Sequence, residues 1–249
     1  MDTDYFGAQE RLHIFNVDLD KPEGFNAAIE GCIGAFHVAH PIDFENKETE
    51  ETITQRAVNG ALGILQTYLN SKTVKRVVYT SSSTTVLVKN SNIVDESSWT
   101  DIDLVTTLKP FASSYIISKT LTEKEALEFA DNGIDLVSVI PTWIHGPFIT
   151  PQIPGSVRSS MEMIYGHQNY SMAYPPNAPF VHIDDVVNAH IFLLENPNAK
   201  GRYTWESSEE LKMPSLSSKK LLETEFLYKH GLEEMYDVAI ECCNQRSIL

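Results

Sequence analysis

This 249-residue sequence lacks several features that define other classes of protein. No apolar run reaches the roughly 20 residues that cross a bilayer, which argues against a membrane-spanning helix. The three cysteines, Cys32, Cys242 and Cys243, cannot form an even disulfide framework. The first residues contain neither a basic leader nor an apolar signal core. We therefore expect a reduced protein of the cytoplasm.

Basic residues are also scarce. Lysine and arginine number 19 against 34 aspartates and glutamates, so the formal net charge is -15. A surplus of negative charge repels phosphate backbones and anionic lipid surfaces. The sequence therefore predicts neither a nucleic-acid partner nor a membrane partner.

A glycine-rich phosphate-binding turn is missing as well. Among the 12 glycines, no three have the spacing G-x-G-x-x-G or G-x-x-G-x-x-G. Gly31 and Gly34 precede and enter an expected strand, and Gly60 and Gly63 lie inside an expected helix, so we interpret both pairs as sites of close packing. The sequence also lacks the G-x-S-x-G, H-E-x-x-H and C-x-x-C motifs of serine hydrolases and zinc sites, and we expect no metal.

What the sequence does contain is an alternation of short apolar runs and helix-like segments, typical of parallel strands joined by crossover helices. We expect strands at 12–17, 33–38, 76–80 and 134–140, and helices at 25–30, after Thr49, at 115–130 and from the N-cap Asp184 to 195. Prolines become frequent after position 140. The fold class is therefore α/β, with a nucleotide-binding core at 1–140 and a smaller, mainly substrate-binding lobe at 141–249.

The most informative polar residues are Tyr115 and Lys119, which are four residues apart and so share one face of a predicted helix. A neighbouring ammonium favours the phenolate form of tyrosine, so this phenol could exchange a proton with a substrate oxygen. Ser82 follows the strand at 76–80, at the carboxyl edge of the sheet, where α/β proteins bind ligands. Each of these signals is weak alone, and an exposed helix face is the plainer interpretation of the pair.

Four longer segments strengthen the signal when they are taken together. They are KRVVYTSSSTTV (75–86), YIISKTLTEK (115–124), IPTWIHGPF (140–148) and VHIDDVVNAHIFLLE (181–195). In these segments the sequence resembles the extended short-chain dehydrogenase/reductases, the group of NAD-dependent epimerases and dehydratases. Within that group it is most similar to the plant branch of vestitone and dihydroflavonol reductases.

The resemblance implies NADPH-dependent reduction of a flavonoid-like or isoflavonoid-like ketone, with a small phenolic ketone as partner. Ser82, Tyr115 and Lys119 would be the catalytic triad, with Ser82 on the substrate carbonyl, Tyr115 as proton donor and Lys119 also on the nicotinamide ribose. Asp18 and Leu19 would lie beside the adenine and Ala39 along the cofactor, with Pro141, Thr142 and Ser156 near the nicotinamide and its phosphates.

In that family the glycine-rich turn precedes the segment that matches Leu12, so the resemblance implies an incomplete Rossmann-like, doubly wound parallel sheet that lacks its first βαβ unit. The strand at 12–17 would then pair with the strand at 33–38, fray, or be covered by a second chain, and we expect self-association through the exposed edge. Two alternatives stay open for the function. One is a catalytically impaired truncated member or splice product that acts as a binding protein, and the other is a nucleotide-sugar epimerase or dehydratase.

Overall fold

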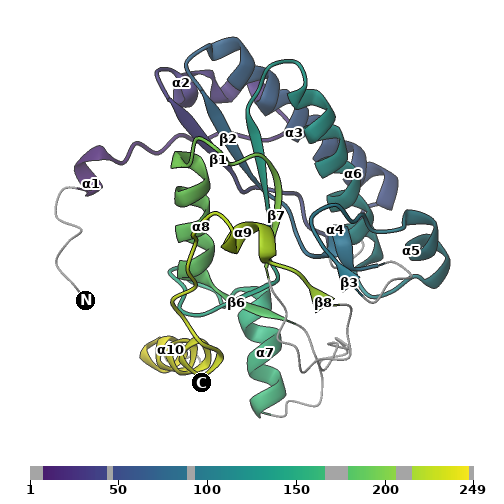
Figure 1. The fold of residues 1–249 in the computed structure, drawn as a ribbon, viewed down its shortest axis with the longest axis vertical. Helices are drawn as coiled ribbons and strands as arrows, with labels where there is room; N and C mark the ends of the chain where they lie inside the picture. Colours follow the sequence, from purple (N-terminus) through teal and green to yellow (C-terminus); the bar gives the residue numbers. More distant parts are fainter. Residues whose placement is uncertain (1–7, 44–46, 89–92, 166–178, 206–214, 247–249) are drawn as a thin grey trace.

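The structure is a computed structural model that describes residues 8–43, 47–88, 93–165, 179–205 and 215–246. Its centre is a four-stranded parallel sheet with the order β1-β2-β4-β7 (Figure 1). The strands are β1 (Gly34–His37), β2 (Arg76–Thr80), β4 (Leu136–Ile140) and β7 (Gly201–Thr204). The α/β class with a parallel sheet is confirmed, and β7 joins the sheet although it lies beyond the expected boundary at 140.

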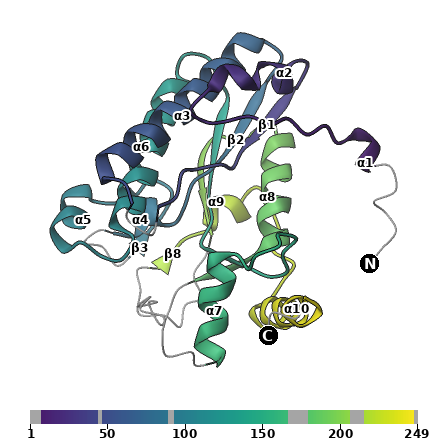
Figure 2. The same cartoon turned by 180° about the vertical axis from the view of Figure 1, so that it is seen from behind.

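Long helices cover both faces of this sheet. Figures 1 and 2 show α3 (Glu50–Ser71) and α6 (Ser113–Ala130) on one side and α8 (Ile183–Glu195) on the other. Alternate β2 residues explain the two layers, since Val77 and Tyr79 pack in the core with α3 and α6 whereas Val78 packs in the core with α8. Side chains that alternate across a strand in this way bury both faces of the sheet.

Shorter elements complete the fold. Before the sheet lie α1 (Ala8–Arg11), the 3-10 helix η2 (Pro22–Phe25) and α2 (Asn26–Ile29), and beside it lie α4 (Thr84–Leu87) and α5 (Ile102–Leu108). Two parallel strand pairs follow: β3 (Ile93–Val94) with β8 (Ser215–Leu216), and β5 (Trp143–His145) with β6 (Phe180–His182). The remaining helices are α7 (Gly155–Tyr165), α9 (Lys219–Leu222) and α10 (Leu232–Gln245), and α7 and α10 share a small apolar core. Among the described helices, none combines the length and the hydropathy needed to cross a membrane.

Most expected elements are present with slightly different ends. Thr49 caps α3 by accepting a hydrogen bond from the Thr52 amide at 3.2 Å, as the sequence predicted. The prediction that Asp184 is the N-cap of α8 is wrong. The cap and the first helical residue lie two residues earlier, and His182 is the cap because its Nδ1 accepts the Asp184 amide at 3.1 Å. Asp184 still lies in the first turn, where its charge favours the helix dipole.

The predicted strand at 12–17 is also wrong. This segment is extended but unpaired, and Leu12, Ile14 and Phe15 are exposed. Its alternating apolar pattern is that of a strand, yet a strand needs a neighbour to satisfy its backbone, and β1 pairs only with β2 in the described sheet. Of the three outcomes expected for this segment, pairing with the strand at 33–38 is contradicted by the described sheet.

Three glycines let two pairs of segments approach closely, as predicted. A methyl group on Gly63 would lie 2.4 Å from the Pro22 ring, and one on Gly60 would lie 3.3 Å from Leu19. Gly34 similarly faces Leu194 at 2.8 Å. Gly31 differs, because it has open space around it and a φ of +75°, so it serves the turn before β1 and not packing.

Candidate functional site

The predicted catalytic residues meet at the carboxyl end of β2. Ser82 follows β2 directly, and its hydroxyl shares a hydrogen bond with the phenol of Tyr115 in the first turn of α6. The Ser82 oxygen also accepts the Thr84 hydroxyl at 3.0 Å and the Thr84 amide at 3.3 Å. These bonds orient the Ser82 hydroxyl, which lies where ligands bind in open parallel sheets.

Lys119 lies one turn after Tyr115 on the same helix. Its Nζ donates a hydrogen bond to the Thr80 carbonyl at 2.9 Å, and only 4% of the residue is exposed. Burial lowers the pKa of Lys119 to about 8, while the nearby Glu123 carboxylate opposes that shift. The site therefore contains a buried ammonium group that is one helical turn from Tyr115 and bonded to the strand end that leads to Ser82.

The electrostatics of Tyr115 differ from the sequence-based expectation. We expected the Lys119 ammonium to lower the pKa of the phenol, but burial raises the pKa of Tyr115 above 10.0, and only the Ser82 hydrogen bond opposes the rise. Removing the phenol from water disfavours its charged form. Tyr115 is therefore protonated at neutral pH, in the form that can donate a proton.

Two histidines near the end of β1 also face this site, and the sequence analysis did not include them. The ring of His40 meets Tyr115 edge-on at 5.9 Å between centroids, and its Nε2 lies 3.2 Å from the Ser118 hydroxyl. His37 stacks on Tyr79 at 5.4 Å. Burial, and then the charge of Lys119, lower the pKa of His37 to about 4 and that of His40 to about 2. Both are therefore neutral at neutral pH. Their place in the sequence could have revealed them, because they lie at the end of an expected strand, and parallel strands such as β1 and β2 end at the same edge of the sheet.

Three of the predicted cofactor residues lie at this same edge. The Pro141 carbonyl, just after β4, accepts the Ser83 amide at 2.9 Å, which places Pro141 beside the Ser82 loop. Thr142 is buried, and its hydroxyl has no hydrogen-bond partner. Ala39 follows β1, and its backbone is hydrogen-bonded to the His37 ring. A buried hydroxyl without a partner is costly, which suits a position that a ligand completes.

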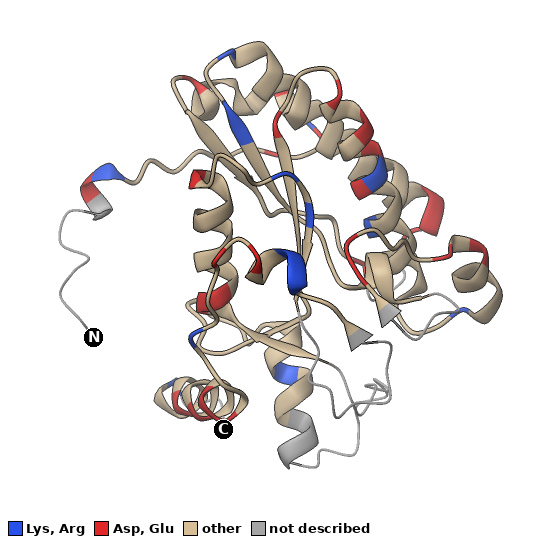
Figure 3. Ribbon diagram, viewed as in Figure 1, with Lys and Arg blue, Asp and Glu red and all other residues tan. Residues whose placement is uncertain are grey.

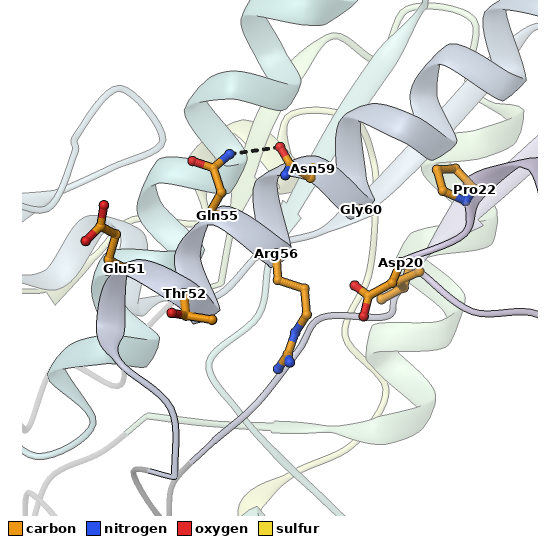
Figure 4. Close-up of a pocket in the computed structure, with 9 residues that line it drawn as sticks. Asp20, Pro22, Glu51, Thr52, Gln55, Arg56, Asn59 and Gly60 are labelled. Atoms are coloured by element: carbon orange, nitrogen blue, oxygen red, sulfur yellow. Dashed lines mark hydrogen bonds between the residues drawn. The ribbon is translucent and has the colours of Figure 1, made fainter.

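The other predicted cofactor residues lie elsewhere. Leu19 lines an open cavity of about 550 Å³ between the 19–22 segment and α3 (Figure 4). Arg56 and Asp20 project toward this space in the figure. Asp18 is exposed in the preceding turn, where its carbonyl accepts the Lys21 amide. Ser156 is in the first turn of α7, a helix that packs against β5.

The glycine geometry bears on how a dinucleotide would fit. The described glycines with a positive φ are Gly31, Gly133, Gly146 and Gly201, and none of them joins the end of a central strand to the following helix. Tyr115, Lys119 and Thr142 are polar groups at the carboxyl edge of the sheet, as the predicted nicotinamide and ribose site requires. The described residues offer no glycine turn for the pyrophosphate.

A second group of titratable residues has the composition of a metal site. His182, Asp184 and His230 place potential ligand atoms within 4.8 Å of one another. However, His182 Nδ1 already accepts the Asp184 amide, and the two imidazole rings stack at 4.0 Å with 25° between their planes. Stacked rings direct their nitrogen lone pairs side by side and not toward a common point. The group is therefore better described as a helix cap packed on a second histidine.

Comparison with known proteins identifies the family of the chain. The chain is 42% identical to vestitone reductase of Medicago sativa, an alignment over 279 positions that covers 99% of this chain and 85% of that protein. It is 39% identical to dihydroflavonol 4-reductase of Callistephus chinensis, with 97% and 75% covered. The crystal structure of vestitone reductase from alfalfa superposes with a TM-score of 0.84 at 38% identity, covering 100% of this chain and 89% of that one.

The aligned length also bears on the fold. The alignment with vestitone reductase spans 279 positions, more than the 249 residues here, so that relative has segments within the matched region that this chain lacks. The family model described as "NAD dependent epimerase/dehydratase family" matches residues 2–205, which include all four central strands and the site. The chain therefore belongs to the NAD dependent epimerase/dehydratase family.

Proposed function

We propose that this protein is an NADPH-dependent reductase of a flavonoid-like or isoflavonoid-like ketone, of the vestitone or dihydroflavonol type. The observation that carries the proposal is the Ser82–Tyr115 hydrogen bond at the carboxyl end of β2, with the Lys119 ammonium one helical turn away. The similarity to vestitone reductase and dihydroflavonol 4-reductase supports this substrate class.

The residues of the chain have distinct roles in this reaction. NADPH, when bound, supplies the hydride that adds to the carbonyl carbon. Ser82 donates a hydrogen bond to the carbonyl oxygen, and Tyr115 transfers its phenolic proton to the same oxygen, which completes the alcohol. The Lys119 ammonium stabilises the phenolate that remains and binds the ribose hydroxyls. The raised pKa of Tyr115 keeps the proton in place until the oxygen gains negative charge.

The predicted cofactor residues would lie along NADPH from the nicotinamide to the adenine. Pro141 and Thr142 border the nicotinamide, with the unpartnered Thr142 hydroxyl directed to the ligand, and Ala39 borders the cofactor from the end of β1. Asp18 and Leu19 bind the adenine end, where Leu19 lines the cavity against α3. We further propose that Ser156 contacts the cofactor from the first turn of α7.

Replacement of Tyr115 by phenylalanine tests the proton donor. The purified protein is titrated with NADPH while fluorescence is followed, and NADPH consumption is then measured with vestitone and with dihydroflavonols. Tyr115→Phe should lower kcat by about 10²- to 10⁴-fold, the range for loss of a general acid, with NADPH affinity nearly unchanged. Lys119→Ala should weaken both binding and turnover.

Tyr79→Phe is the matched control. It removes a second buried phenol hydroxyl, one that has no hydrogen-bond partner, so it should leave turnover at the wild-type level. Wild-type turnover in Tyr115→Phe would refute the assigned proton donor. No NADPH binding at millimolar concentration would refute the reductase function for this chain.

The free edge of β1 favours a second function, self-association. Among the described strands, β1 pairs only with β2, and Ile33, Phe36 and Val38 on or beside it are exposed by 72%, 43% and 60%. An open edge with apolar side chains is a surface on which another strand can pair. We propose that a second copy of this chain occupies it. Self-association is compatible with an active enzyme, and it is also the function expected of a catalytically impaired family member.

A further inference from the structure

Glu123 is a fully buried carboxylate on α6 that the proposed chemistry does not use. It follows Lys119 by four residues and Tyr115 by eight, so all three lie on one face of the helix. Arg202 of β7 holds it with two hydrogen bonds, Nε to Oε1 at 2.9 Å and Nη2 to Oε2 at 3.0 Å. A buried charge is tolerated when it is paired and fully hydrogen-bonded.

Both partners of this ion pair are saturated. Ser81 donates to Glu123 Oε2 at 2.6 Å and Ser138 donates to Oε1 at 2.5 Å, so each carboxylate oxygen accepts two bonds. The remaining Arg202 donors reach the carbonyls of Glu96 and Ser98 and the hydroxyl of Thr85. The resulting network joins α6 to β2, β4 and β7.

Of these contacts, the hydrogen bond between Ser81 and Glu123 lies nearest to Ser82 and Tyr115 in the chain. Three consecutive residues at the end of β2 each contact a different residue of α6. The pairs are Thr80 with Lys119, Ser81 with Glu123 and Ser82 with Tyr115. Ser81 therefore stands between the two contacts that build the site, and its position fixes how the β2 end meets the helix.

We propose that Glu123 is a positioning residue, which through its hydrogen bond from Ser81 holds the end of β2 against α6 so that Ser82 meets Tyr115. This inference deepens the proposed reductase function and rests on it. Glu123 and Ser81 do not touch the substrate. Their contribution is the alignment of the hydroxyl pair, and small misplacements of reacting groups reduce rates strongly.

A pair of matched variants tests the proposal. Ser81→Ala and Ser138→Ala each remove one buried hydroxyl from the same carboxylate, at bonds of similar length, but only Ser81 adjoins Ser82. We expect Ser81→Ala to lower kcat by roughly 10- to 100-fold with KM little changed. Ser138→Ala should keep the wild-type kcat and KM. Equal effects of the two variants, or no effect of Ser81→Ala, would overturn the proposal.

A measurement without turnover separates this inference from the proposed function. In protein with ¹³C-labelled tyrosine, the ring signal of Tyr115, assigned by its loss in Tyr115→Phe, should move in Ser81→Ala and stay in place in Ser138→Ala. If the wild type reduces no ketone but the signal moves in this way, the reductase function fails and the positioning role stands. If the signal is the same in Ser81→Ala as in the wild type, the positioning role is wrong whatever the activity.

The positioning role of Glu123 is tested by replacing Glu123 and its ion-pair partner Arg202 together. Glu123→Gln alone leaves Arg202 buried without a counter-charge, which is expected to destabilise the fold. The double variant Glu123→Leu with Arg202→Met removes both charges and keeps the volume, so its folding can be preserved. If the folded double variant shows the same Tyr115 signal as the wild type, the assignment to Glu123 is refuted. A signal displaced as in Ser81→Ala supports it.

Discussion

At the scale of single residues, the central feature is that Lys119 keeps its charge although the residue is buried. The cost of burial appears in its pKa, which falls from 10.5 to about 8, and the charge of the Glu123 carboxylate compensates only in part. His37 and His40 add no positive charge beside it, because both are neutral at neutral pH. The ammonium therefore persists near neutrality by a narrow margin.

The pKa of Lys119 predicts how activity depends on pH. A lysine loses its charge as the pH rises through its pKa, so kcat/KM for ketone reduction should fall as the pH rises past about 8, well below the ordinary lysine range. The titratable groups around it are His37 and His40 from the end of β1, Tyr79 from β2, and Tyr115 and Glu123 from α6. The two histidines have pKa values near 4 and 2, and burial raises those of both tyrosines, so none of them explains a loss at pH 8.

The pH profile of NADPH consumption measures this effect. Lys124→Met, which removes an exposed lysine from the same helix, should leave the profile unchanged. An activity that stays constant until the pH reaches the ordinary lysine range would contradict the assigned role of Lys119.

The residues of the site could be found from sequence only in part. The spacing of Tyr115 and Lys119 and the position of Ser82 were sufficient to bring the three together, because helix periodicity and strand ends are local properties. The pKa of Tyr115 could not be predicted, since its direction depends on desolvation by side chains distant in sequence. The link from Glu123 to Arg202 spans 79 residues and leaves no local pattern.

At the scale of elements, the packing of α3 against the 18–25 segment depends on two glycines in the helix, Gly60 and Gly63. Glycine inside a helix costs about 1 kcal/mol relative to alanine, so its presence needs a packing reason. Pro22 lies over Gly63 and Leu19 lies over Gly60, and both are contacts that a methyl group would disturb. The two glycines thus lower the intrinsic helix propensity of α3 but allow the 18–25 segment to pack closely on it.

The two glycines should respond differently to alanine. Both substitutions gain the same helix propensity, but a methyl group at Gly60 would be 3.3 Å from Leu19 whereas one at Gly63 would be 2.4 Å from the Pro22 ring. We expect Gly63→Ala to lower the free energy of unfolding by about 1–3 kcal/mol through overpacking, and Gly60→Ala to change it much less. Urea unfolding of the two variants measures the difference. A Gly63→Ala protein as stable as Gly60→Ala would show that the 18–25 segment does not pack on α3.

Elements with strong local signals were predictable, and those that depend on neighbours were not. The Thr49 cap, the β-branched run of β2 and the helix expected at 115–130 are present, the helix with two further residues at its start. The segment 12–17 has the pattern of a strand but no strand beside it, so its pattern alone could not place it in the sheet. At α8, a histidine nitrogen took the capping role that sequence rules assign to aspartate.

At the scale of the whole molecule, two surface properties oppose each other. Figure 3 shows acidic residues on several helices around the sheet, including α5, α6, α8 and α10, and the net charge is -15. Two copies of such a molecule repel one another. The free edge of β1, with Ile33, Phe36 and Val38 exposed, favours association instead. Which of the two prevails depends on how far salt screens the charges.

Self-association should therefore grow with both protein concentration and salt. Sedimentation velocity at low and high salt measures it, and Ile33→Lys should reduce it by placing a charge beside β1. Ile149→Lys is the matched control, since it changes the net charge equally at an isoleucine that is 95% exposed in the loop between β5 and α7. If lysine at either position reduced association equally, the general charge would govern it and the β1 edge would not. A wild-type protein that stays monomeric at high salt would exclude the edge as an interface between copies, because screening leaves apolar contact intact while it removes the repulsion.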